Sequence, residues 1–161
     1  MISTPSYLRN AQAVLDAFGY WPSFHDAPVT DFRYEPNGAG AVEFTVHGCQ
    51  TAEFDDRGFA KLIKHHLIGF VFRDISKPDL GRFTSMANIL FGLGFSTPEE
   101  CKTAGGFEVR LDSALGSDLC GSFFARNGEV LTVVPCDEDG RRTEPAGRGE
   151  PPPATVFAKP F

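Results

Sequence analysis

Histidine and acidic side chains that could act as a general base lie next to each other at one point of the sequence. His25 is followed by Asp26, and a carboxylate beside an imidazole can fix the tautomer of the ring and make it a base. Adjacent residues on an extended chain point to opposite sides, however, so this pair need not be in contact. We therefore expect structural roles, with Asp26 capping backbone N–H groups and His25 held by the aromatic residues around it.

A second group of residues has the chemistry of metal ligands. His47 and Cys49 are two residues apart and would share one face of a strand. Zinc would need two further ligands, for example His65 or His25, and the sequence does not show whether these residues converge. We expect no metal ion and no cofactor. A small metal-binding domain or enzyme that uses His25 and Asp26 with His47 and Cys49 stays open as an alternative.

Other catalytic signatures are missing from the sequence. It contains no G-x-S-x-G nucleophile elbow and no P-loop, and residues 38–40 lack the third glycine and the following helix of a dinucleotide fingerprint. These absences favour a protein that is not an enzyme, and we assign no catalytic residue.

Composition and charge narrow the class of protein further. The chain has 161 residues, which suits one domain, and a formal net charge of −6. That charge argues against nucleic-acid binding and is compatible with a basic protein partner. The chain begins without the features of a signal peptide and has no apolar run of membrane-spanning length. We expect a cytoplasmic protein whose four widely spaced cysteines are reduced.

Hydrophobic periodicity predicts the elements that position these residues. Residues 5–18 have one apolar face of a helix, ending at Gly19. Apolar and polar residues alternate over 30–35 and 42–47, which predicts a hairpin, and residues 67–73 read as a central strand. The remaining expectations are an irregular segment over 48–60, helical spacing from Met86 to Leu93, a helical turn beginning at 97–100, strands over 107–112 and 119–125, and a hairpin turn at 127–128 leading into a strand over 130–134.

These elements predict an α+β domain over residues 1–136. We expect an antiparallel sheet of about six strands, with the N-terminal helix packed on one face. Residues 137–161 form a Pro/Gly-rich extension that contains few residues able to pack. Its apolar end, with Val156, Phe157 and Phe161, leaves open that the protein is a self-associating structural module and a homo-oligomer.

An aromatic stretch, residues 18–26, connects the predicted helix to the first strand. It holds the only tryptophan, Trp21, together with three other aromatic residues. Such an apolar connection is either folded under the domain or offered to a partner, and we expect Trp21 to be mostly buried.

This stretch and two later blocks carry a resemblance to a known family. The opening block is residues 18–27 and precedes a strand hairpin. The other blocks are residues 66–75 with Phe83 and 88–90, and the strand pair 107–112 and 119–125. Over roughly residues 7–135 the chain resembles the immunity protein 50 family of bacterial polymorphic toxin systems, and Trp21 through Asp26 is the best motif.

The resemblance implies a small cytoplasmic protein that binds and neutralises a cognate toxin by occlusion, without catalysis. Trp21, His25 and Asp26 carry over as the family signature, which is compatible with a structural role. No toxin-contacting residue carries over. Weak candidates for partner binding come from the acidic residues, which would speed association with a positive partner: Asp55, Asp56, Glu99 and Glu100.

Overall fold

We describe the protein from a computed structural model, which covers residues 4–81, 88–97, 99, 106–113 and 119–143. Within these residues there are nine strands and one complete α-helix. They are β1 (Leu8–Arg9), α1 (Gln12–Phe18), β2 (Ala27–Glu35), β3 (Ala41–Phe54), β4 (Ala60–Arg73), β5 (Ser76–Leu80), β6 (Ile89–Ser96), β7 (Phe107–Ser113), β8 (Gly121–Ala125) and β9 (Asn127–Pro135).

The predicted fold class, an α+β domain with about six antiparallel strands, is wrong. The described residues form mostly β structure, in one mixed sheet of nine strands with the order β1-β9-β4-β3-β2-β6-β7-β8-β5. All neighbouring pairs are antiparallel except β1 and β9, which run parallel. The helix has only seven residues and packs against β9 and β4, so it covers only a small part of the sheet.

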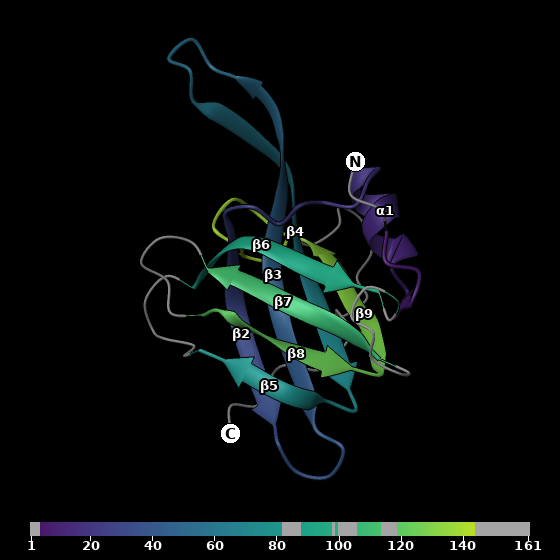
Figure 1. The fold of residues 1–161 in the computed structure, drawn as a ribbon. Helices are drawn as coiled ribbons and strands as arrows, with labels where there is room; N and C mark the ends of the chain where they lie inside the picture. Colours follow the sequence, from purple (N-terminus) through teal and green to yellow (C-terminus); the bar gives the residue numbers. More distant parts are fainter. Residues whose placement is uncertain (1–3, 82–87, 98, 100–105, 114–118, 144–161) are drawn as a thin grey trace.

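The sheet folds over on itself at β2. Ala27 and Pro28 of this strand pair with β6, whereas its residues from Val29 onward pair with β3. Figure 1 shows the result, because β5, β6, β7 and β8 lie in front of β2, β3, β4 and β9 and cross their direction. Two layers of one continuous sheet therefore face each other.

Aromatic side chains fill the space between the two layers. Phe72 of β4 contacts Phe107 of β7 and Phe123 of β8, with ring centroids 6.1 and 5.4 Å apart. Phe70, two residues earlier on the same strand face, packs against Phe95 of β6. Offset and edge-to-face ring contacts of this kind stabilise a core beyond the area that they bury.

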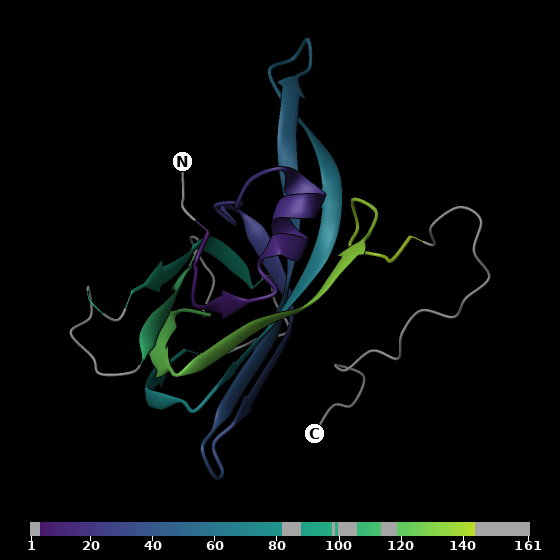
Figure 2. The same ribbon diagram turned by 90° about the vertical axis from the view of Figure 1, so that its right-hand side faces the viewer.

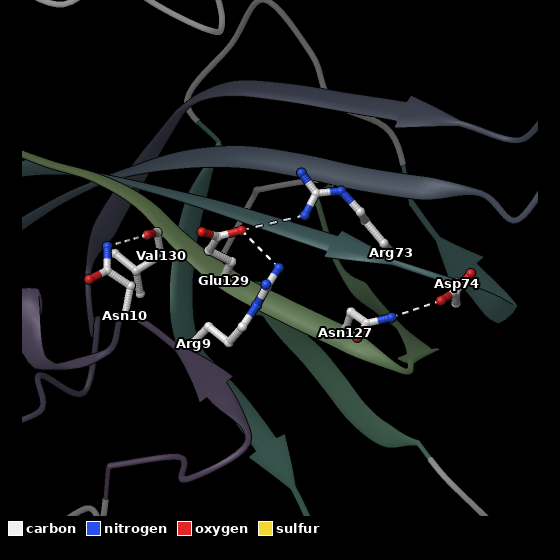
Figure 3. A network of polar contacts seen from close by, with 7 residues as sticks. All are labelled: Arg9, Asn10, Arg73, Asp74, Asn127, Glu129 and Val130. Atoms are coloured by element: carbon white, nitrogen blue, oxygen red, sulfur yellow. Dashed lines mark hydrogen bonds and ion pairs between the residues drawn. The ribbon is translucent and has the colours of Figure 1, made fainter.

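The N-terminal segment differs from the predicted helix over 5–18. Its first part is β1, and α1 begins only at Gln12, because Asn10 has a left-handed backbone (φ 60°) that ends the strand before the helix. Asn10 Nδ2 donates to the carbonyl oxygen of Val130, and Arg9 forms an ion pair with Glu129 (Figure 3). The segment is therefore attached to β9.

Two later elements also differ from the sequence prediction. The helical spacing from Met86 onward corresponds to strand β6 from Ile89, and Met86 itself lies outside the described residues. The predicted turn at Asn127 does not join paired strands, since β8 pairs with β7 and β5 whereas β9 pairs with β4 and β1. Gly128 permits this crossing, because a Cβ atom there would come within 2.9 Å of Leu8 and Phe107 side-chain atoms.

The hairpin of β3 and β4 extends far beyond the rest of the sheet. The pairing of β3 with its neighbour β2 ends at Val46. The pairing of β4 with its neighbour β9 ends at His66. The remaining part, residues 49–64, is a two-stranded projection that stands clear of both layers in Figures 1 and 2. We call residues 49–64 the arm. The sequence predicted an irregular segment over 48–60, which is wrong for residues 48–54, because β3 continues to Phe54 and only the turn over 55–59 separates it from β4.

Among the described residues, no helix has the length and apolar character required to cross a membrane.

Candidate functional site

Trp21, the central residue of the aromatic stretch, belongs to the core. It is 4% exposed and packs edge-on against Phe24, Phe70 and Phe95, with ring centroids 5.9 to 6.4 Å apart. The expectation that Trp21 is mostly buried is confirmed. Its contacts join the connection after α1 to β4 and β6, so the residue stabilises the fold and is not displayed to a partner.

His25 and Asp26 form an ion pair at the surface. His25 Nδ1 lies 3.0 Å from Asp26 Oδ2, and the imidazole also packs against the exposed ring of Phe91. The sequence argument assumed an extended chain, on which neighbours diverge. Phe24 and Asp26 instead have left-handed backbones (φ 56° and 58°), which turn the two side chains toward each other.

The surroundings of this pair do not assemble a catalytic group. Ser23 is the nearest hydroxyl in sequence, and its Oγ accepts a hydrogen bond from the backbone N–H of His25. Both side chains are largely exposed, so their attraction is screened by water. The arrangement can orient an imidazole on the surface, and it does not activate a nucleophile among the described residues.

His47 lies at the base of the arm and is buried, unlike His25. Its Nε2 is 2.9 Å from Nδ1 of His65 on β4, and the backbone of Gly140 lies against the other side of the ring. Burial lowers the pKa of His47, and the neighbouring His65 lowers it further, whereas Asp137 acts in the opposite direction. The neutral imidazole is therefore favoured at this position.

The thiols near His47 are poor candidates for metal ligands. Burial raises the pKa of Cys49, and burial together with the nearby Asp137 and Cys49 raises the pKa of Cys136 to about 11. Both thiols are therefore protonated at neutral pH, and a zinc ion would have to displace their protons on binding. In the described part of the chain, no three His, Cys, Asp or Glu side chains form a group that could hold a metal ion.

The structure therefore does not bring together the residues of the metal-site alternative. His25 and Asp26 contact Phe91 on β6, whereas His47 contacts His65 on β4. His65 was named in the sequence only as a possible further ligand, and its direct contact with His47 was not foreseen.

The acidic candidates for partner binding lie at different places. Asp55 and Asp56 form the tip of the arm, and Glu99 is exposed elsewhere on the surface. Glu100 lies outside the described residues. Asp55 has a structural role, because its Oδ1 accepts hydrogen bonds from the backbone N–H groups of Arg57 and Phe59, each at 2.9 Å. Only Asp56 remains as a freely presented acid at the tip.

The arm exposes large apolar side chains. Phe54 is 69% exposed, Phe59 68% and Leu62 46%, which makes them half of the exposed large hydrophobic residues in the described chain. Phe54 pairs with Ala60, and Leu62 lies two residues further along β4, so Phe54 and Leu62 share one face of the arm.

The opposite face of the arm is polar. Glu53 pairs with Lys61 across the two strands, and their charged groups are 3.3 Å apart. The ion pair is exposed and contributes little to stability. The arm therefore has one apolar face and one polar face. Its acidic and basic residues balance, so charge alone would not attract a binding partner to the arm.

A turn motif in the sequence could have revealed the arm. Residues 55–58 read Asp-x-x-Gly, and the structure forms a tight turn in which Gly58 has φ 81°. The same motif occurs at residues 137–140, where Asp137 Oδ1 accepts from the N–H groups of Asp139 and Arg141 and Gly140 has φ 78°. A type I turn followed by a left-handed glycine is a frequent hairpin connection.

The second motif changes the description of the C-terminal extension. Residues 136–143 fold into a short hairpin, in which Cys136 bridges to Arg142 and the N–H of Thr143 donates to the carbonyl of Pro135. We call this segment the 136–143 hairpin. The extension was expected to contain few packed residues from 137 onward, yet Gly140 packs on His47. Residues 144–161, including Val156, Phe157 and Phe161, lie outside the described residues.

Comparison of the chain with models of protein families, with curated proteins and with solved structures found no match.

Proposed function

We propose that the protein is an immunity protein, which binds a cognate bacterial toxin domain and blocks it by occlusion through the arm. The single observation that supports this proposal is the arm itself, a two-stranded projection with Phe54 and Leu62 exposed on one face. An isolated two-stranded hairpin is only marginally stable in water, and exposed apolar side chains on such an element favour a partner protein that covers them.

Two further features support the same proposal. The sequence resembles the immunity protein 50 family over roughly residues 7–135, and the net charge of −6 would attract a basic toxin domain over a distance. Charge would then act mainly on the rate of association, while the apolar face of the arm would supply the buried anchor residues. A projecting hairpin is well shaped to enter a substrate groove, which a flat surface cannot do.

The test is titration calorimetry with the C-terminal domain of the toxin encoded beside this protein. We expect tight binding and loss of toxin activity for the wild-type chain. The double variant Phe54→Ser with Leu62→Ser should bind about 100-fold more weakly, because two anchor residues together contribute about 3 kcal/mol. Phe91→Ser is the matched control, since Phe91 is 59% exposed but lies on β6.

Each outcome of this titration decides one part of the proposal. Absence of binding by the wild-type chain would reject the immunity function. Binding by the double variant that equals the wild type would place the interface outside the arm. A loss of affinity in the Phe91→Ser control would make β6, and not the arm, the contact surface.

The open strand edges of the arm favour a second candidate, which is self-association. Along residues 49–64, each arm strand has the other as its neighbour and no third strand among the described residues, so its outer backbone groups could pair with a second copy. Sedimentation velocity distinguishes the two functions. A dimer that the double variant disperses would support self-association, whereas a monomer that binds toxin supports the first proposal.

A further inference from the structure

The regular pairing of β3 with β4 is interrupted at the base of the arm. The pairing register shifts between the pairs Gly48–His66 and Gln50–Ile63, so Cys49 on β3 lies opposite two residues of β4, Lys64 and His65. The extra residue is therefore on β4. On β4, Lys64 has a left-handed backbone with φ 53°, which is unusual for a residue other than glycine. This bulge in β4, with its left-handed Lys64, lies where the neighbouring strands β2 and β9 stop pairing, and it forms a natural pivot for the arm.

Three contacts brace this pivot. His47 and His65, one on each strand, form a direct hydrogen bond of 2.9 Å between ring nitrogens. The backbone N–H of Cys136 donates to the carbonyl of His65, which attaches the 136–143 hairpin. Lys64 Nζ donates to the carbonyl of Phe18 at the C-terminal end of α1. The His47–His65 pair is the only one of the three that joins both arm strands through side chains.

A hydrogen bond between two imidazoles depends on how many protons the pair holds. One ring nitrogen donates and the other must accept, so the pair keeps its bond when both rings are neutral or when one is charged. When both rings are protonated, two N–H groups face each other at the position of the bond, and the like charges repel. The contact is therefore lost when the pair takes up its second proton.

The groups around His47 determine how easily that proton is taken up. His65 faces it from β4, and Asp137 faces it from the segment after β9. The nearby thiols of Cys49 and Cys136 have raised pKa values and are neutral near pH 7. Only Asp137 favours protonation of His47, while burial and His65 disfavour it. The net effect lowers the pKa of His47 from its ordinary value of 6.5.

We propose that the His47–His65 hydrogen bond is a pH-sensitive latch, which holds the arm in its binding position and releases it on acidification. The inference rests on the proposed function in one respect, namely that the released arm would bind the toxin domain more weakly. Release itself is a property of this chain alone. It can therefore be tested without a toxin.

The test is hydrogen–deuterium exchange of the full chain, followed by mass spectrometry, at about pH 7.5 and about pH 5. Protection factors, corrected for the intrinsic exchange rate at each pH, are compared for arm peptides (49–64) and for the β4 segment inside the sheet (67–73). We expect protection of the arm to fall about tenfold at the lower pH relative to that segment.

Two histidine variants separate the latch from a general acid effect. His65→Gln keeps a hydrogen-bonding side chain but takes up no proton, so its arm should show the same protection at both pH values. His25→Gln is the matched control, because His25 also contacts an acidic residue but lies away from the arm base, and it should behave as the wild type. An arm whose protection does not change with pH, or changes equally in His65→Gln, would overturn the latch.

Two additional measurements keep the outcomes distinct. If His65→Gln does not fold, NMR titration of the wild-type histidines decides, since a latch requires the His47 and His65 resonances to titrate in a coupled manner and independent titration rejects it. Toxin binding is then measured at both pH values. Absence of binding at about pH 7.5 rejects the immunity function, while the exchange result still confirms or rejects the latch.

Discussion

Both halves of the β3–β4 hairpin contain phenylalanine side chains, but these lie in opposite environments. In the half inside the sheet, Phe44 and Phe70 face each other and are fully buried, whereas in the arm Phe54 is 69% exposed. The inner half has β2 and β9 as neighbours, and the arm has none among the described residues. Adjacent strands and the opposing layer bury the phenylalanines of the inner half, and those of the arm lack such neighbours among the described residues.

The largest effect should come from truncating one phenylalanine in each half. Phe70→Ala should lower the free energy of unfolding by about 3–5 kcal/mol, because it leaves a cavity among packed aromatic rings. Phe54→Ala should change it by less than about 0.5 kcal/mol, since its side chain is already in water. Urea unfolding of both variants measures the difference. Similar losses would show that the arm is packed in solution.

A smaller difference is expected between the two Asp-x-x-Gly turns, one at the arm tip and one against the sheet. Asp137→Ala removes the acceptor of two backbone N–H groups in the 136–143 hairpin, and it should lower stability by about 1–2 kcal/mol. Asp55→Ala removes the equivalent bonds, but the arm can open locally without global unfolding, so the expected loss is below about 0.5 kcal/mol. Equal thermal shifts in the two variants would contradict this separation.

The smallest effect concerns the pH dependence of stability. The pKa of His47 is lowered in the folded protein, so the unfolded chain takes up this proton first as the pH falls below 6.5. Unfolding then becomes easier, and stability is lost on acidification. In His47→Gln this contribution is missing. Urea unfolding between about pH 7.5 and pH 5 should show a stability difference, wild type minus variant, that decreases toward acid. A difference that is constant with pH would exclude a role for His47.

The alternating segments of the fold were predictable from the sequence, and the chain connectivity was not. The hairpin of β2 and β3 and the apolar strand over 67–73 follow the periodicity expected for strands. The segment before α1 has equally regular apolar spacing, yet β1 pairs with β9, from which it is separated by about 120 residues along the chain. A contact over such a distance leaves no signal in the local sequence. The predicted helix over 5–18 therefore included the residues of β1.

The candidate site was less predictable than the fold. Burial of Trp21 was foreseen from its aromatic neighbours, but the contact between His25 and Asp26 depends on two left-handed residues that no local pattern announces. The His47–His65 contact joins residues 18 positions apart across a register shift. The arm was missed because residues 49–54 lack alternation, although the Asp-x-x-Gly turn that follows them was visible in the sequence.

The position of β9 between β1 and β4 has a consequence for synthesis of the protein on the ribosome. Strand β4 keeps one open edge, beside Phe70 and Phe72, until β9 has been translated. Only then can Glu129 join Arg9 and Arg73 in the three-residue ion-pair group of Figure 3. A nascent chain interrupted before β9 would expose the unpaired backbone groups of β4. Chaperones would therefore bind it differently from the finished protein.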